Sequence, residues 1–163
     1  MVAELLTRTC FSLLDGASQP HELVQAALAG GVGHLGICDR DGVYGLVQAH
    51  QAAQESGLHL ICGATLTLDG LPSVVVHCVD RSGWASLCHL LTLGRAEQTK
   101  GWSKLSLAAI CEHHRGLMCT LRPGWEPSEA APLREAYGER LSVALSRDLT
   151  PADPHRTAAA QAL

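Results

Sequence analysis

Hydrophobic positions along this chain follow two different spacings. Short, nearly continuous apolar runs alternate with segments in which apolar residues recur every three or four positions. The short runs are typical of buried β-strands, whereas the wider spacing is typical of amphipathic helices. The alternation therefore predicts βα units around a mostly parallel sheet, an α/β fold.

The individual elements follow from where each pattern starts and stops. Strands are predicted at 2–7, 34–39, 58–68, 117–122 and 141–147. Helices are predicted from an N-cap at Ser18 to Gly30, at 43–56, at 83–97, from Ser106 to near Gly116, and between the last two strands. The final segment, 150–163, has the pattern of a helix that has only begun. An Asp69-Gly70 pair between two β-like runs predicts one antiparallel hairpin, because glycine tolerates the positive φ of the turn.

Composition narrows the class of protein. The 163 residues suit a single domain, with 47% apolar and 17% charged residues. No apolar run reaches the roughly 18 residues expected of a membrane span, and the first residues lack a signal-peptide pattern. We therefore expect one domain over 1–163, in the cytoplasm and without a membrane partner.

Cysteine and charge exclude two further classes. The seven cysteines form no CxxC pair, and their odd number argues against a disulfide framework or a thiolate zinc site. The net charge is −4 and no basic run occurs, which argues against an extended nucleic-acid surface. A local contact with DNA stays open.

Candidate chemistry lies where predicted strands end. In α/β sheets and (β/α) barrels, functional side chains collect in the loops at the carboxyl ends of the strands. The residues at those positions are Arg8, Asp15, Asp39, Arg40, Thr65, Arg122, Arg147 and Asp148.

Three stretches carry a resemblance to a known family. "AELLTRTCFSLLDGAS", "LGICDRDGVYGLVQAHQAAQESGLHLICGATL" and "VVVHCVDRSGWASLCHLLTLGR" resemble the start of the polymerase and histidinol phosphatase (PHP) domain of bacterial C-family DNA polymerases, most closely the error-prone α subunit. The resemblance covers about 2–147. It implies a distorted (β/α) barrel in which His, Asp and Glu side chains of active members hold divalent metals for phosphoester hydrolysis.

Most of the ligand positions implied by this resemblance carry other residues here. They fall on Leu6, Arg8, Asp15, Arg40 and Thr65, with a further one near Ser73. Of the five, Asp15 alone keeps a side chain that binds metals well, because leucine offers no ligand and arginine is a fixed cation. We therefore expect no metal, no cofactor and no catalytic residues.

The arginines and Asp15 have two interpretations each. Arg8 and Arg40 either substitute for the positive charge of the metals, by pairing with Asp15 and Asp39 or by holding a phosphate or a DNA backbone, or form ordinary salt bridges, which is the commoner case. Together with Asp15, Asp39 and Thr65 they define a candidate anion pocket or vestigial pocket. Asp15 is more often a turn residue than a ligand once its companions are lost.

Other reactive residues have ordinary explanations. His77, His113 and His114 lack a second ligand at a recognised spacing, and Cys38 and Cys62 lack a visible base, so surface histidines and buried thiols are expected. The aromatic residues Tyr44, Trp84, Trp102 and Trp125 are not interleaved with basic residues, which argues against a stacking platform for single strands.

Three functions remain. The favoured one, implied by the resemblance, is a metal-free, inactive PHP region, a partial or degenerate (β/α) barrel that is incomplete at its C-terminus. It would support an error-prone polymerase α subunit, contact the rest of that subunit or other replication and repair proteins, and not be an enzyme alone. The alternatives are a residual phosphoesterase using Asp15 and Asp39, and a stand-alone interaction module or remnant.

Overall fold

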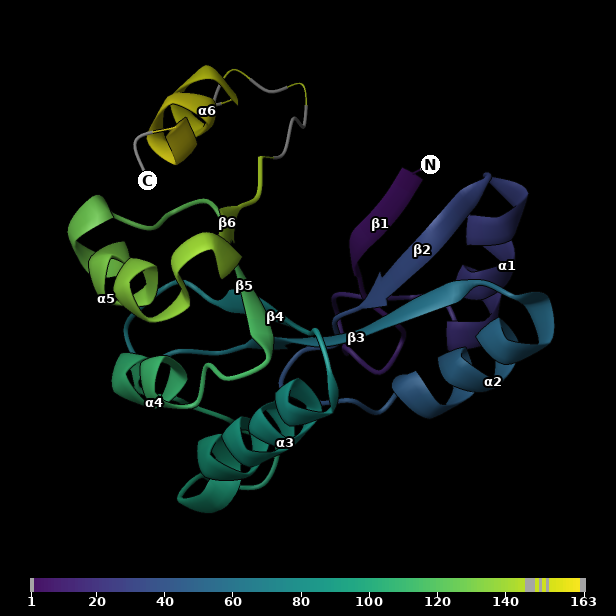
Figure 1. Cartoon of the computed structure of the whole chain (residues 1–163), viewed down its shortest axis with the longest axis horizontal. Coiled ribbons are helices and arrows are strands. Elements are labelled where there is room, and N and C mark those ends of the chain that lie inside the picture. Colours follow the sequence, from purple (N-terminus) through teal and green to yellow (C-terminus); the bar gives the residue numbers. More distant parts are fainter. Residues whose placement is uncertain (1, 146–148, 150, 152, 162–163) are drawn as a thin grey trace. The chain divides into compact units, whose positions relative to one another are not determined.

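The computed structural model describes residues 2–145, 149, 151 and 153–161 (Figure 1). The chain divides into two compact units, Met1–Thr65 and Leu66–Leu163. Strands alternate with helices in both units, as the two hydrophobic spacings predict.

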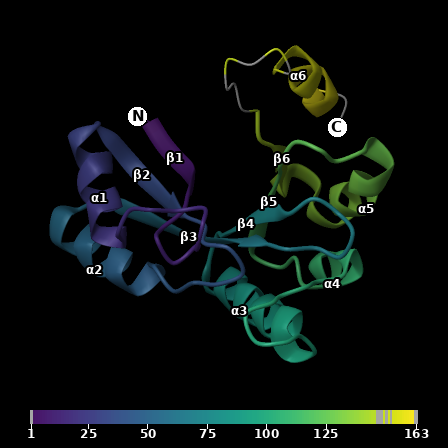
Figure 2. The ribbon, with the colours of Figure 1, turned by 180° about the vertical axis from the view of Figure 1, so that it is seen from behind.

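The first unit is built from two βα repeats and a third strand. Its elements are β1 (Val2–Thr7), α1 (Pro20–Ala29), β2 (Val32–Ile37), α2 (Leu46–Ser56) and β3 (His59–Leu66), whose last residue belongs to the second unit. The β1–β2 and β2–β3 pairs are both parallel. Helices α1 and α2 lie side by side in Figures 1 and 2.

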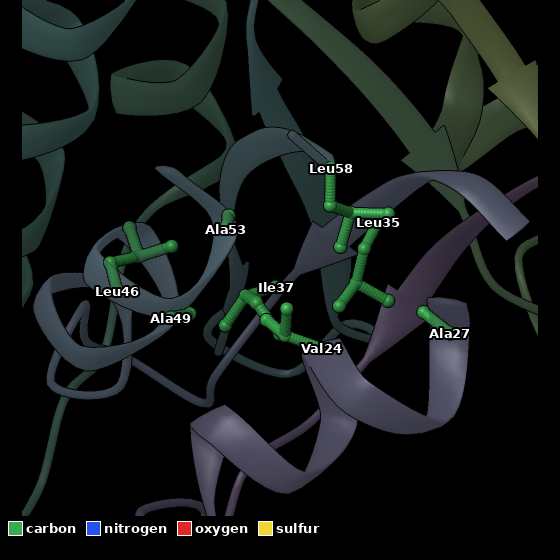
Figure 3. Packing of buried hydrophobic residues seen from close by; sticks show 8 residues of the cluster. All are labelled: Val24, Ala27, Leu35, Ile37, Leu46, Ala49, Ala53 and Leu58. Carbon is green, nitrogen blue, oxygen red and sulfur yellow. The ribbon is translucent and has the colours of Figure 1, made fainter. Parts of the chain in front are cut away.

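The core of this unit lies between the two helices and the strands. Buried side chains of α1, β2 and α2 pack there, and Figure 3 shows them pointing toward one another. They are Val24, Ala27, Leu35, Ile37, Leu46, Ala49 and Ala53, with Leu58 just before β3. Burying such side chains removes apolar surface from water, which is the main force that fixes the helices on the sheet.

The second unit contains the antiparallel pair. Its elements are β4 (Val74–Cys78), α3 (Arg81–Ala96), α4 (Leu107–Glu112), β5 (Leu117–Leu121), α5 (Pro127–Tyr137), a 3₁₀ turn (Gly138–Arg140), β6 (Leu141–Val143) and α6 (Asp153–Gln161). Strand β4 pairs antiparallel with β5, and β5 pairs parallel with β6. Gly70 has the expected positive φ of 66° in the turn before β4. The antiparallel pair was predicted as a hairpin across this turn, whereas it is formed by β4 and β5, which α3 and α4 separate in the sequence.

One local prediction is wrong. The N-cap of α1 is Gln19 and not Ser18. Pro20 occupies the first helical turn, so the cap moves to the residue before it. The Glu22 carboxylate accepts a 2.7 Å hydrogen bond from the Gln19 N–H, and the Ser18 carbonyl accepts one from Cys10 N–H at 2.9 Å.

Candidate functional site

The carboxylate of Asp39 organises the end of β2. Asp39 is 1% exposed and accepts hydrogen bonds from Thr9 N–H at 2.8 Å and from the Ser12 hydroxyl at 2.8 Å. The Thr9 hydroxyl lies 2.8 Å from its second oxygen, and Gly45 N–H lies 3.3 Å from that atom. Buried carboxylates need such donors to offset the loss of water. Asp39 thereby fastens the loop after β1 and the start of α2 to the end of β2.

Gly45 leaves room for this arrangement. A Cβ atom added there would lie 2.7 Å from both the Asp39 Oδ2 atom and the Thr9 hydroxyl oxygen. Such distances are shorter than van der Waals contact. Glycine is therefore the residue that lets the backbone N–H approach the carboxylate.

Asp15 lies between two arginines. Its Oδ2 atom is 3.2 Å from the Arg8 guanidinium and 3.0 Å from that of Arg40. Arg40 also donates to the Leu13 carbonyl at 2.9 Å, so one guanidinium group holds both a carboxylate and a backbone oxygen of the loop before α1. The side chains of Arg8 and Asp15 are 20% and 31% exposed, which makes this a partly shielded ion-pair cluster.

Arg40 and Thr65 join the same region through their backbones. The Arg40 N–H donates to the Ser12 hydroxyl at 2.9 Å, and residues 40 and 65 form a parallel bridge. The Thr65 hydroxyl donates to the Cys38 carbonyl at 3.0 Å. Thr65 is 2% exposed, so its hydroxyl is shielded from bulk solvent and bonds the neighbouring strand end.

The four charges of this cluster balance formally. Arg8 and Arg40 contribute two positive charges, and Asp15 and Asp39 contribute two negative ones. A divalent cation at Asp15 would meet two guanidinium groups within about 4 Å, where like charges repel strongly in a partly buried site. Among the residues that the structure describes, no group of three or more His, Cys, Asp or Glu side chains could hold a metal ion.

The structure brings together five of the six residues predicted for the candidate pocket and its ligand positions. Arg8, Asp15, Asp39, Arg40 and Thr65 meet at the carboxyl ends of β1, β2 and β3. Leu6 lies on β1, is 40% exposed, and its N–H donates to the Glu4 carboxylate at 3.0 Å.

Several other candidates have structural explanations in the described parts of the chain. His77 is 6% exposed, so the expectation of a surface histidine is wrong at this position, which lies inside the buried strand β4. His113 packs edge-on against His89, and His114 accepts a 2.7 Å hydrogen bond at Nδ1 from Arg140. Trp125 is 2% exposed, whereas Trp102 is 72% exposed. Arg147 and Asp148 lie outside the described residues.

The two candidate thiols are poorly suited to nucleophilic chemistry. Burial raises the pKa of the Cys62 thiol, which lowers its thiolate fraction at neutral pH. Cys38 is 1% exposed and its thiol donates to the Leu5 carbonyl at 3.3 Å.

Sequence reasoning missed Thr9, Ser12 and Gly45. These residues supply the donors and the space around Asp39. Thr9 and Ser12 follow directly after β1, where a polar residue in an otherwise apolar stretch signals a buried hydrogen bond. Nothing in one sequence indicates that their common acceptor lies about 30 residues downstream, because that contact depends on the parallel pairing of β1 with β2.

The fold and site define an α/β protein with a charged cluster at the carboxyl ends of parallel strands, the position where such folds carry their chemistry. The PHP domain family matches residues 4–145. The chain belongs to that family.

Two similar curated proteins are both named error-prone DNA polymerase. The protein from Bdellovibrio bacteriovorus is 38% identical over 90% of this chain, and the one from Anaeromyxobacter dehalogenans is 37% identical over 98%. The chain spans only 15% of the length of either relative.

Solved structures share the fold. A putative metal-dependent phosphoesterase from Bifidobacterium adolescentis aligns over 99% of this chain and 82% of its own, with a TM-score of 0.66 and 13% identity. An amidohydrolase from Chromobacterium violaceum, described with bound sulfate and no metal, aligns over 97% of this chain and 82% of its own, with a TM-score of 0.64 and 16% identity. The prediction of an α/β fold of the PHP type is confirmed. Among the described helices, none has the length and apolar character to cross a lipid bilayer.

Proposed function

We propose that this chain is a catalytically inactive, metal-free PHP region that forms the N-terminal scaffold of an error-prone DNA polymerase α subunit in the cytoplasm. The match to PHP domains and the relatives named error-prone DNA polymerase support this assignment. The chain spans 15% of those relatives, which fits one portion of a larger polymerase.

The observation that carries the proposal is the ion-pair cluster at Asp15. Both Arg8 and Arg40 contact the same Oδ2 atom, at 3.2 and 3.0 Å, so the carboxylate already has two cationic partners. Asp39 is fully engaged by donors of the loop after β1 and of Gly45. Ion pairs and hydrogen bonds thus stabilise the positions that a metal would otherwise hold together. Without a metal, no water is activated to attack a substrate phosphate.

The residual phosphoesterase hypothesis needs Asp15 and Asp39 around one metal. Asp15 would have to leave both arginines, and Asp39 would have to give up four donors in a buried site. The cost of leaving such donors unpaired argues against it.

Metal content and hydrolysis test the proposal together. After incubation with zinc or manganese and removal of the excess, elemental analysis is expected to find far less than one ion per chain. Hydrolysis of bis-p-nitrophenyl phosphate should equal the buffer rate for the wild type, Asp15→Asn and the control Asp69→Asn. Stoichiometric metal, or activity that Asp15→Asn abolishes and Asp69→Asn preserves, would establish the phosphoesterase instead.

The polymerase context is tested separately. We expect the endogenous polypeptide, isolated from its own cells and weighed intact, to have the mass of a polymerase. A mass equal to these 163 residues would contradict the scaffold assignment and support a stand-alone module.

A further inference from the structure

The loop between β1 and α1 exposes three large apolar side chains. Leu14 is fully exposed, Leu13 is 73% exposed and Phe11 is 40% exposed. Single exposed apolar residues are common on protein surfaces, whereas neighbouring ones are typical of interaction sites.

Leu14 also has an unfavourable backbone. Its φ is +68°, in the left-handed region that leucine rarely adopts because its Cβ crowds the following carbonyl. The turn is closed behind it by hydrogen bonds from Asp15 N–H and Gly16 N–H to the Ser12 carbonyl, both at 2.9 Å. Backbone strain of this kind persists only where surrounding contacts impose it, and it is concentrated at functional positions.

The ion-pair cluster supplies those contacts. Arg40 holds the Leu13 carbonyl at 2.9 Å on one side of Leu14, and Arg8 and Arg40 hold the Asp15 carboxylate on the other. The backbone on both sides of Leu14 is therefore fixed to residues that follow β1 and β2. The exposed leucine is presented at a defined position and does not fold back onto its own chain.

Charge indicates which kind of partner fits this loop. Arg8 and Arg40 both contact Asp15, and the buried carboxylate of Asp39 adds a second negative charge to the same region, so the formal charges cancel and leave no surplus for a phosphate backbone. Nucleic acids are bound largely through such a surplus. An apolar recess in a protein is the complementary surface for Leu13 and Leu14.

The lengths of the relatives bear on which polypeptide supplies that recess. The matched stretch spans 15% of each error-prone polymerase. Most of each polypeptide therefore lies outside this stretch and is covalently linked to it. A tethered surface needs few contacts to bind, because its effective concentration is high.

We propose that Leu13 and Leu14 dock into an apolar recess of the remaining polymerase polypeptide, with the Arg8–Asp15–Arg40 cluster holding the loop in its docking conformation. This inference rests on the proposed function. It gives the cluster a present role in positioning a protein contact.

Site-specific photocross-linking tests the contact in the polypeptide that contains this chain in its own cells. p-Benzoylphenylalanine replaces Leu14 or, as a control, Val47, which is 68% exposed on α2 of the same unit. Position 14 is expected to give at least about tenfold more cross-links to segments outside residues 1–163. Equal yields from both positions, or cross-links only to nucleic acid or to a second copy, would overturn the proposal.

A substitution at Leu14 gives a second test, because it should change Tm in opposite directions in the 163-residue chain and in the whole polymerase. Leu14→Asn should raise the Tm of the 163-residue chain by about 2 °C, since asparagine tolerates positive φ, and lower the Tm of the whole polymerase. Val47→Asn, which has a similar helix propensity, should not show this reversal. A change of Tm in the same direction in both proteins contradicts docking.

The docking proposal and the proposed function can fail separately. An endogenous polypeptide with the mass of 163 residues contradicts the polymerase proposal itself, whereas a polymerase-sized polypeptide without cross-links from position 14 contradicts docking alone.

Discussion

Removing the carboxylate of Asp39 is expected to destabilise this protein more than any change at Asp15. Asp39→Ala leaves the N–H groups of Thr9 and Gly45, and the hydroxyls of Thr9 and Ser12, without their acceptor in a site that is 1% exposed. A buried donor without a partner costs about 1–3 kcal/mol. The two hydroxyls can rotate toward other acceptors, but the two backbone N–H groups cannot. The free energy of unfolding should therefore fall by about 4 kcal/mol.

Asp15→Ala is the matched comparison. It removes two ion pairs, yet the Asp15 and Arg40 side chains are 31% and 45% exposed, so water replaces much of the interaction. Partly exposed pairs of this kind contribute about 0–1 kcal/mol. For a chain of this length, Asp39→Ala should lower Tm by about 8–16 °C and Asp15→Ala by about 4 °C at most.

Urea titration followed by far-ultraviolet circular dichroism measures both free energies. Asp39→Asn, which keeps one oxygen, should fall between the wild type and Asp39→Ala. A decrease in the free energy of unfolding below about 1 kcal/mol for Asp39→Ala, or an equal decrease for Asp15→Ala, would refute this reasoning. It would show that Asp39 does not stabilise this region more than the ion pairs do.

Two further predictions concern the second unit. Burial raises the pKa of the Cys119 thiol to about 12, from 9.0. The folded state therefore keeps this proton after the unfolded thiol has lost it, so its stabilising contribution is complete below pH 9 and declines as pH rises from 9 toward 12. Tm measured from pH 8 to 11 should fall less steeply in Cys119→Ala, and rapid alkylation of native Cys119 at pH 9 would contradict this. Gly83→Ala should lower the free energy of unfolding by about 3 kcal/mol in a urea titration, because the new Cβ would clash with the Gly116 carbonyl oxygen. A cost like that of Ala85→Gly on the same helix, about 1 kcal/mol, would show that the backbone shifts easily.

Much of the fold was predictable because local periodicity determines it. The first strand was predicted at 2–7 and is observed at Val2–Thr7, and the helix predicted at 43–56 is observed at Leu46–Ser56. The later start of α2 has a local reason. Residues 40–45 form the loop whose Gly45 N–H reaches Asp39, so the helix begins only after that contact.

The candidate site was predictable in position but not in bonding. Strand ends predicted that Arg8, Asp15, Asp39 and Arg40 would meet, and the parallel pairing of β1 with β2 brings them together. The acidic partner of each arginine depends on the direction of its side chain, and the sequence pattern does not predict that direction. Asp39 appeared to be a possible partner of Arg40, whereas both arginines contact Asp15, and Asp39 binds neutral donors.

The shared carboxylate has an evolutionary consequence. Because Arg8 and Arg40 contact the same oxygen of Asp15, replacing either one by histidine leaves the other guanidinium group at the carboxylate, and replacing Asp15 leaves two neighbouring cations without a counter-ion. Replacing one arginine alone therefore neither frees Asp15 from guanidinium contacts nor keeps the complete cluster, so we expect residues 8 and 40 to be replaced together in related chains that keep Asp15.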